Sequence, residues 1–142
     1  MSYDLKIENG DLRISNTGDL AVVKDNEKLL QDALKILLTP LGGNKAHTWY
    51  GSNVGDTLIG AVFDKDFSID AASQQVRSAM DNLQMIQKSQ SKTQIVTAAE
   101  TISVVKDIYL NSNIKDQRLI EARITLLTNA LTLVAVKFIV RL

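Results

Sequence analysis

The feature that most constrains this chain is its last segment, residues 131–142, whose pattern is that of a strand with two apolar faces. One face is entirely apolar and consists of Val134, Val136, Phe138, Val140 and Leu142. The other face mixes apolar and basic side chains, namely Leu133, Ala135, Lys137, Ile139 and Arg141. Such a strand must be covered on both faces, and as an exposed edge it would promote aggregation. It therefore needs either a central place in its own sheet or a partner chain that supplies a strand or a cover.

The second solution is favoured, because only residues 118–128 supply a certain neighbouring strand. Within it, residues 119–127 alternate apolar and polar side chains, and Thr128-Asn129-Ala130 predicts the turn of an antiparallel hairpin. We therefore predict that the C-terminal hairpin is available for strand addition by a partner. The residues of the last segment expected to bind that partner are Leu131, Leu133, Val134, Val136, Phe138, Val140 and Leu142.

The chain as a whole predicts a single α+β domain over residues 1–142, with strands, then helices, then strands. Residues 1–25 alternate apolar and polar positions and contain the hairpin turn Asn9-Gly10, which predicts a small β-meander. Residues 26–107 are expected to be mainly helical, with two to four helices. Residues 108–142 form the C-terminal β-region.

The first helix is expected to start at a cap formed by Asp25 or Asn26 and to end at Leu38, because Thr39 precedes Pro40. Its apolar stripe is predicted at Leu30, Leu34, Leu37 and Leu38, widened by Ala33. The residues of this helix expected to face water are Lys28, Asp32 and Lys35.

Further helices are expected in the middle of the chain. Ser52 or Asn53 caps a short helical turn that ends near Ile59, and Ser68 caps a long helix over residues 69–90. Thr97 and Glu100 have the spacing of a capping box, in which each side chain accepts a bond from a free amide of the first turn. This box predicts a short helix near residues 102–105.

Composition excludes several classes of chemistry. The 142 residues include no cysteine and one histidine, which rules out disulfides, cysteine-ligated zinc, iron–sulfur clusters and a histidine-rich metal site. The 16 basic and 16 acidic residues balance, whereas nucleic-acid-binding domains usually carry a basic excess. We expect no cofactor, no nucleic-acid partner and no membrane span, since the longest apolar stretch is short and contains Lys137 and Arg141.

No catalytic constellation stands out. His47 is the only histidine, and the Gly-x-Ser-x-Gly motif of serine hydrolases is absent. A hydrolase would need paired carboxylates, and the candidates would be Glu27, Glu100 and the acidic stretch 56–66. Trp49 and Tyr50 form the densest aromatic pair, which suits either a platform for a carbohydrate or peptide, or an anchor that packs the loop after the first helix.

The order of short motifs resembles a known family. Two Gly-Asp-Leu-like turns, at 10–12 and 18–20, lead into a leucine-rich helix that ends in Leu38-Thr39-Pro40-Leu41-Gly42. Trp49-Tyr50-Gly51-Ser52, a long helix, Glu100-Thr101-Ile102 and a closing hairpin follow. This order is similar to that of the small baseplate wedge family of contractile phage tails, once labelled lysozyme-like, which has relatives in pyocins and type VI secretion.

The resemblance implies a non-catalytic structural subunit of a virion tail baseplate, assembled in the host cytoplasm. It implies contacts with larger baseplate wedge subunits and with the tail sheath protein, and places tail tube or hub proteins among the candidate neighbours. Several copies would stand in a six-fold assembly. Members of the family resemble clamps on the inner ring, and their closing strands accept strands from the first sheath ring, so that they act as sheath initiators.

One departure from the family and two alternatives bear on this assignment. Many relatives carry a Glu-Pro-Arg triad before the closing β-region, whereas here only Glu100 matches it. Glu100 is thus the one residue of the triad predicted to contact a partner. The other predicted partner contacts outside the last segment are Trp49 and Tyr50 of the aromatic loop. The alternatives are a tail-associated peptidoglycan hydrolase that uses Glu27 or Glu100, and a non-enzymatic assembly adaptor outside any tail.

Overall fold

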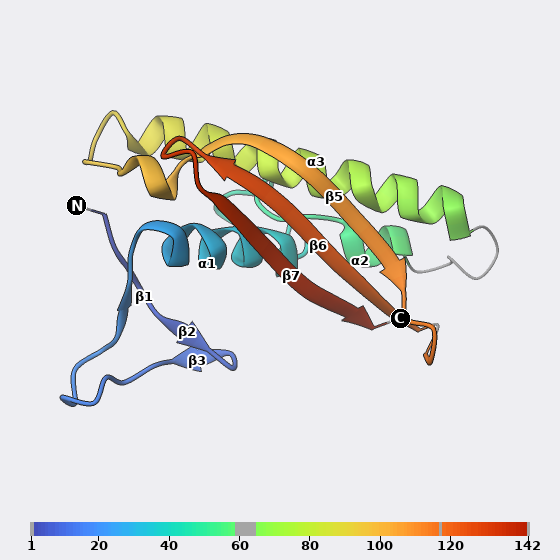
Figure 1. Ribbon diagram of the computed structural model, residues 1–142, viewed down its shortest axis with the longest axis horizontal. Helices are drawn as coiled ribbons and strands as arrows, with labels where there is room; N and C mark the ends of the chain where they lie inside the picture. The colour runs from blue at the N-terminus through green and yellow to red at the C-terminus, as the bar shows by residue number, and fades with distance from the viewer. Residues whose placement is uncertain (1, 59–64, 117, 142) are drawn as a thin grey trace.

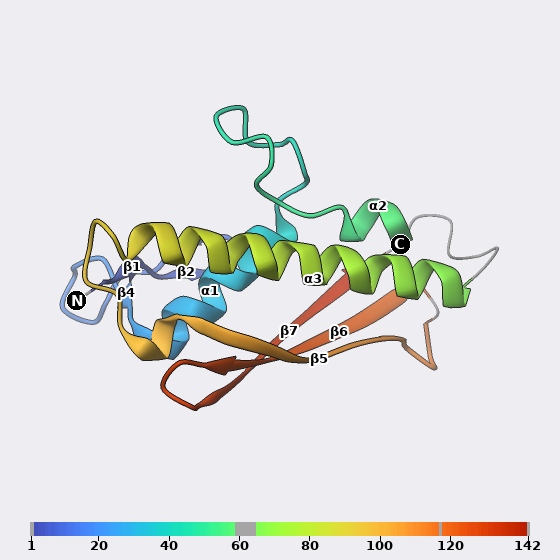
Figure 2. The same ribbon diagram turned by 90° about the horizontal axis from the view of Figure 1, so that it is seen from above.

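The computed structural model describes residues 2–58, 65–116 and 118–141 and has an α+β fold. Two long helices pack against one face of a three-stranded antiparallel sheet, and a small group of short strands lies beside them at the N-terminus (Figure 1, Figure 2). The elements in chain order are β1 (Asp4–Leu5), β2 (Ile7–Glu8), β3 (Asp11–Leu12), β4 (Val22–Val23), α1 (Asp25–Leu38), α2 (Val54–Leu58), α3 (Lys65–Gln90), the 3-10 turn η1 (Ala98–Glu100), β5 (Ile102–Ser112), β6 (Leu119–Thr128) and β7 (Leu133–Arg141).

The N-terminal strands confirm the predicted turn. Asn9 and Gly10 both have positive φ, 54° and 82°, as a two-residue hairpin turn requires, and they join β2 to β3. β1 pairs with β4 rather than with its neighbour in sequence. Gln31 of α1 holds this small group of strands, because its amide accepts a bond from the N–H of Ile7 and donates one to the carbonyl of Leu5.

The C-terminal sheet has the strand order β5-β6-β7, and its second hairpin was predicted from the alternation of residues. β6 and β7 pair without a break from Leu119 opposite Arg141 to Leu127 opposite Leu133. β5 pairs with β6 less regularly, with register shifts between Ile102 and Val104 and between Val105 and Asp107.

The helix predicted near 102–105 is wrong, and so is the helical boundary at 107, because β5 already begins at Ile102. The capping box closes only the 3-10 turn η1. Gln87 of α3 then accepts a bond from the N–H of Ile102 (2.9 Å) and donates one to the carbonyl of Glu100 (2.8 Å). These two bonds satisfy backbone groups at the start of β5 and hold this part of the chain extended. The β-branched residues of β5 favour the extended conformation.

The core lies between the two long helices and the inner face of the sheet. β6 and β7 contribute every second residue, and the helices contribute one stripe each. The fully buried members of this core with less than 2% exposure include Leu29, Ile36, Val54, Leu58, Val76, Met80, Ile120, Ile124, Leu126 and Val136.

The predicted stripe of α1 is wrong by one residue. The buried residues are Leu29, Ala33, Ile36 and Leu37, whereas Leu38 is 61% exposed. Lys28, which was expected to face water, is buried because its ammonium donates to Asp32 (2.9 Å) and lies 3.8 Å from Glu100. The predicted cap is also wrong, since Lys24 occupies the N-cap and the Asp25 carboxylate instead accepts a bond from the Thr97 hydroxyl.

The other helices follow the predictions more closely. α1 ends at Leu38 and α2 covers residues 54–58, as expected. α3 buries the predicted positions Ala72, Val76, Met80 and Leu83, but it begins at Lys65, so that Ser68 lies inside the helix and not at its N-cap as predicted. The predicted end of the short helix at residues 59–60 lies outside the described residues.

Candidate protein-interaction site

The outer edge of β7 presents unpaired backbone groups. The N–H of Thr128 donates to the carbonyl of Thr132 (2.9 Å), so 128 and 132 form a hydrogen-bonded pair. Hydrogen-bonded and open pairs alternate along an antiparallel ladder. With the observed register, the backbone of even-numbered residues of β7 therefore bonds to β6, and the backbone of odd-numbered residues points to the open edge. Those odd-numbered residues are Leu133, Ala135, Lys137, Ile139 and Arg141.

This edge is open over its whole length. Within residues 2–58, 65–116 and 118–141, no backbone hydrogen bond joins β7 to any element other than β6. β7 spans nine residues, or about 30 Å at the usual rise of a strand. A second extended chain could therefore pair with it along several hydrogen bonds.

Two grooves border β7, one near its start and one near its end. The first, of about 480 Å³, lies at Leu133–Ala135 and is bounded by Ile7 of the N-terminal hairpin and by Leu30 and Leu34 of α1. The second, of about 290 Å³, lies at 138–141 and is bounded by Leu37 and Leu38 of α1 and by Val54 of α2. Their walls include apolar side chains of α1 at both ends. An added strand would thus find a backbone partner and an apolar floor together.

The opposite edge of the sheet is less suited to pairing. β5 contains two register irregularities, and bulges of this kind twist an edge away from further strands. Its start is also occupied, because the Gln84 amide donates to the carbonyls of Ile102 and Ser103. The two edges therefore differ, and β7 is the regular one.

The predicted contact residues of the last segment divide between the two faces of β7. Val134, Val136 and Phe138 point into the core with at most 9% exposure, so their side chains do not meet a partner as predicted. Val140 is half-buried, and Leu142 lies outside the described residues. Leu131 and Leu133 are exposed, as is Ile139, and these side chains remain available for a contact.

Sequence reasoning did not select Ala135, Lys137, Ile139 and Arg141, whose backbone lies at the open edge. The pattern placed them on the second face of the strand, whereas the predicted contacts were drawn mainly from the entirely apolar face. The alternation itself carried the signal, since the entirely apolar face of a terminal strand is the one that its own core needs.

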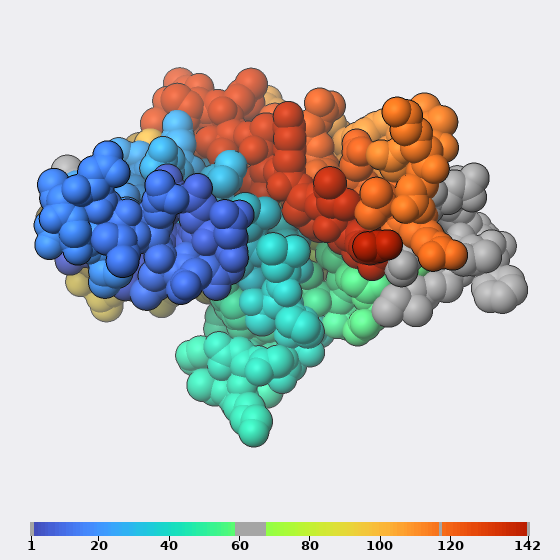
Figure 3. Space-filling model, turned by 90° about the horizontal axis from the view of Figure 1, so that it is seen from below, coloured from blue at the N-terminus to red at the C-terminus, as the bar shows by residue number. Residues whose placement is uncertain are grey.

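The loop between α1 and α2 projects from the body and carries the predicted aromatic pair (Figure 2, Figure 3). His47, Trp49 and Tyr50 pack on one another with ring centroids 5.6 and 6.3 Å apart. Trp49 is about half exposed, and Tyr50 is half-buried. They line a cleft of about 790 Å³ against Met85 and Ile86 of α3. This geometry is compatible with both predicted roles of the aromatic pair, as a platform for a carbohydrate or peptide and as an anchor that packs the loop.

The base of this loop is fixed. The Ser52 hydroxyl donates to the carbonyl of Leu37 (2.6 Å), and the N–H of Ser52 donates to the carbonyl of Thr39 (2.9 Å). Gly51 has a φ of 120°, and a Cβ there would lie 2.6 Å from the carbonyl oxygen of Thr39. The chain therefore requires glycine at this position to bring the aromatic residues next to α3.

Glu100 does not face a partner. Its side chain is 1% exposed, and Oε1 accepts a bond from the N–H of Thr97 (2.7 Å) in the predicted capping box. Oε2 has no hydrogen-bond partner among the described residues, and the Lys28 ammonium lies 3.8 Å away. The predicted direct contact is thus replaced by an internal role that links η1 to α1.

The residues proposed for hydrolysis do not form a site in the described part of the chain. Glu27 is exposed on α1 and Glu100 is buried, while Asp56 lies on α2 and Asp64 is outside the described residues. No group of three or more histidine or acidic side chains that could hold a metal ion is found in residues 2–58, 65–116 and 118–141. None of the described helices has the length and apolarity needed to cross a membrane.

Comparisons with known proteins do not add to this picture. No protein-family model, no curated protein and no solved structure matches the chain.

Proposed function

We propose that this chain is a structural, non-catalytic subunit of a contractile-tail baseplate that initiates sheath assembly by accepting a strand on the open edge of β7. The observation that carries the proposal is the combination of a regular unpaired edge with an apolar floor on α1. Strand addition of this kind derives its affinity from backbone bonds and its specificity from alternate side chains.

The place of the chain in a tail rests on the order of its motifs. The leucine-rich helix ending in Thr39-Pro40, the Trp49-Tyr50-Gly51-Ser52 loop and the closing hairpin resemble the small baseplate wedge family. The larger wedge subunits and the sheath protein are the partners that this resemblance implies. The projecting aromatic loop provides a second surface, which would bind the wedge while β7 receives the sheath strand.

The burial of Glu100 supports the non-catalytic proposal over the hydrolase. A carboxylate that protonates a glycosidic bond must touch its polymer substrate, whereas Glu100 is enclosed by η1, α1 and α3. Its capping and pairing contacts give it a structural role. The adaptor outside a tail shares the same edge and differs only in its partners.

The experiment compares the tagged chain with an Ala135→Pro variant, each captured from the native source in high salt. Proline lacks the N–H that Ala135 turns to the open edge, so pairing with a partner is blocked while the ladder to β6 is kept. We expect the parent to bring down large wedge subunits and a sheath protein in fixed stoichiometry, and the variant to lose the sheath protein.

A second variant guards against a folding defect in the first. Leu30→Gln removes apolar surface from the groove floor, and Ile95→Gln is its matched control, since Ile95 is 76% exposed and lines neither groove. Sheath capture should fall with Leu30→Gln and stay unchanged with Ile95→Gln. The proposal would be contradicted if the captured chain brought down no partner and lysed cell walls. It would also be contradicted if Ala135→Pro and Leu30→Gln both captured the sheath protein as fully as the parent.

A further inference from the structure

Two basic side chains face each other on the outward face of the C-terminal sheet. Lys137 of β7 lies directly opposite Arg123 of β6, and Arg123 lies opposite Tyr109 of β5. The guanidinium of Arg123 stands over the Tyr109 ring, 5.7 Å from its centroid, which draws it toward β5. By the alternation established above, Arg123 and Lys137 form a non-hydrogen-bonded pair, in which side chains approach more closely than in a hydrogen-bonded pair.

This arrangement leaves a positive charge without a counter-charge. Like charges directly opposite one another destabilise a sheet. Within the part of the chain that the structure describes, neither Arg123 nor Lys137 takes part in an ion pair. The two adjacent rungs carry one acidic residue each, Glu121 opposite Ile139 and Asp107 opposite Thr125. The Glu121 carboxylate accepts a bond from Asn113, and neither acidic residue forms an ion pair with Arg123 or Lys137 within the described residues.

On the side of Lys137 away from Arg123, β7 has no neighbouring strand among the described residues. A strand added to the edge of β7 would place one of its side chains next to Lys137 on the same face, as β6 does with Arg123. A concavity of about 770 Å³ lies over the outward face of the sheet beside this position, and Tyr109, Glu121, Arg123, Lys137 and Ile139 are among the residues that line it. A side chain of the incoming strand therefore has both room and an unmet charge to meet.

We propose that the strand accepted by β7 carries a carboxylate at the position beside Lys137. This inference rests on the proposed function and adds the chemistry of the partner. The positions beside Leu133 and Ile139 take apolar side chains, and the position beside Arg141, four residues from Lys137, takes a second acidic one. Residues between these positions point toward Leu30, Leu34 and Leu37 of α1 and are apolar. The partner segment thus alternates, with an apolar inner face and an acidic outer face.

A symmetric peptide tests this inference without knowledge of strand direction. The peptide has a nine-residue core between Gly-Ser flanks. Its four inward positions are all valine, and its five outward positions are, in order, Ile-Thr-X-Thr-Ile. X is glutamate, glutamine or lysine, so the central side chain meets Lys137 in a parallel or an antiparallel pairing. The other outward positions are kept neutral and symmetric, so the peptide tests only the position beside Lys137. Binding to the full chain is measured by isothermal titration at low and high salt.

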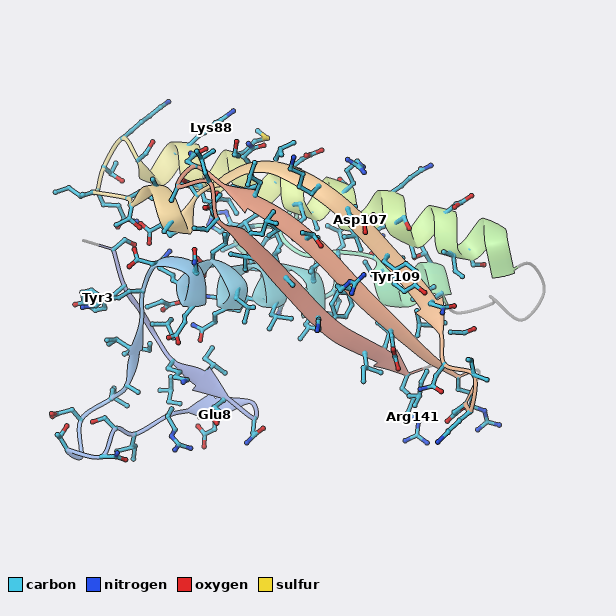
Figure 4. The ribbon with its side chains drawn as sticks, viewed as in Figure 1. Tyr3, Glu8, Lys88, Asp107, Tyr109 and Arg141 are labelled. Carbon is cyan, nitrogen blue, oxygen red and sulfur yellow. The ribbon has the colours of Figure 1, made fainter. Side chains whose placement is uncertain are left out.

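The glutamate peptide should bind about three- to five-fold more tightly than the glutamine peptide, and the lysine peptide more weakly than both. The preference should shrink at high salt, because exposed charges are screened. Lys137→Gln should abolish it and Lys137→Glu should reverse it. Lys88→Gln, in the last turn of α3 and outside the concavity that Lys137 lines, is the matched control and should leave the preference unchanged (Figure 4).

The outcomes separate this inference from the proposed function. Equal binding of the three peptides to the parent chain would overturn the acidic partner and leave strand addition intact. Binding of none of them would count against strand addition on β7 itself. A preference for glutamate that survives in Lys137→Gln would also overturn the inference, because a residue other than Lys137 would then bind the carboxylate.

Discussion

The Lys35 ammonium on α1 lies 2.5 Å from the Asp4 carboxylate of β1 and 2.9 Å from that of Asp32 on its own helix. Gln31 adds a bond to the same Asp4 carboxylate. These contacts fasten the N-terminal strands, which expose several large apolar side chains and bury few, to the body of the fold. The attachment is therefore largely polar, and it should respond to pH.

The first prediction concerns acid. Burial raises the pKa of Asp4, but the hydrogen bond and charge of Lys35 outweigh it and hold the pKa below its ordinary value of 3.8. Because the folded-state pKa is depressed, this pair stabilises the fold above the unfolded value, and the contribution disappears as pH falls through the folded value. We expect Asp4→Asn to lower the free energy of unfolding at pH 7 by up to about 1 kcal/mol, since the pair is partly exposed. Urea unfolding should show this loss at pH 7 and little difference at pH 2.

The second prediction concerns alkali. Burial lowers the pKa of Lys35, and its bonds to Asp4 and Asp32 more than offset this, so the pKa lies above 10.5. A raised folded-state pKa means that the stabilisation is complete below the unfolded value and is lost as pH rises through the folded value. Lys35→Met should therefore be less stable than the parent at pH 7 and should converge with it in strong alkali. A constant gap between the two unfolding curves from neutral pH to the alkaline limit would contradict this linkage.

The third prediction concerns Glu100. Glu100→Ala leaves the N–H of Thr97 without its acceptor and the buried Lys28 with only Asp32, so it should cost about 1–3 kcal/mol of unfolding free energy. Glu100→Gln keeps an acceptor for Thr97 and should cost less. Chemical denaturation measures both, and Glu121→Ala on the exposed face of β6 serves as the control. Equal stability of Glu100→Ala and the parent would show that the buried contacts contribute nothing.

The fourth prediction concerns two glycines near the aromatic loop. Gly51→Ala would force a Cβ against the carbonyl of Thr39 at a φ of 120°, and should destabilise the fold by about 1–3 kcal/mol. Gly55→Ala, in the helix α2 with open space around it, should instead stabilise by about 0.4–1 kcal/mol. Trp49 is the only tryptophan, so its fluorescence should also shift in Gly51→Ala and not in Gly55→Ala. An unchanged spectrum in both would mean that the loop base is not fixed by Gly51.

Local patterns made much of the fold predictable. Asn9-Gly10 specifies its turn through the φ values that the two residues tolerate, and β6 and β7 follow from strict alternation. Helix α1 ends where Pro40 requires. In each case neighbours in the sequence decide the conformation, so tertiary context has little to override.

Long-range contacts decided what the sequence could not. Lys28 is buried because Glu100, distant along the chain, comes to lie beside it, and no helical pattern contains that information. Ile102 begins a strand instead of a helix because Gln87 takes its N–H. The open edge of β7 lies within the segment from which the partner contacts were predicted, but which face of β7 is exposed depends on the side that the helices cover.

The measurement that tests the central claim most directly is amide hydrogen exchange along β7, in the free chain and in the assembled particle. In the free chain, the amides of Val134, Val136 and Phe138 should be protected, and those of Ala135, Lys137 and Ile139 should exchange rapidly. In the particle, the second set should become protected as well, because a partner strand accepts their hydrogen bonds. Rapid exchange of Ala135, Lys137 and Ile139 in the particle would contradict strand addition on β7.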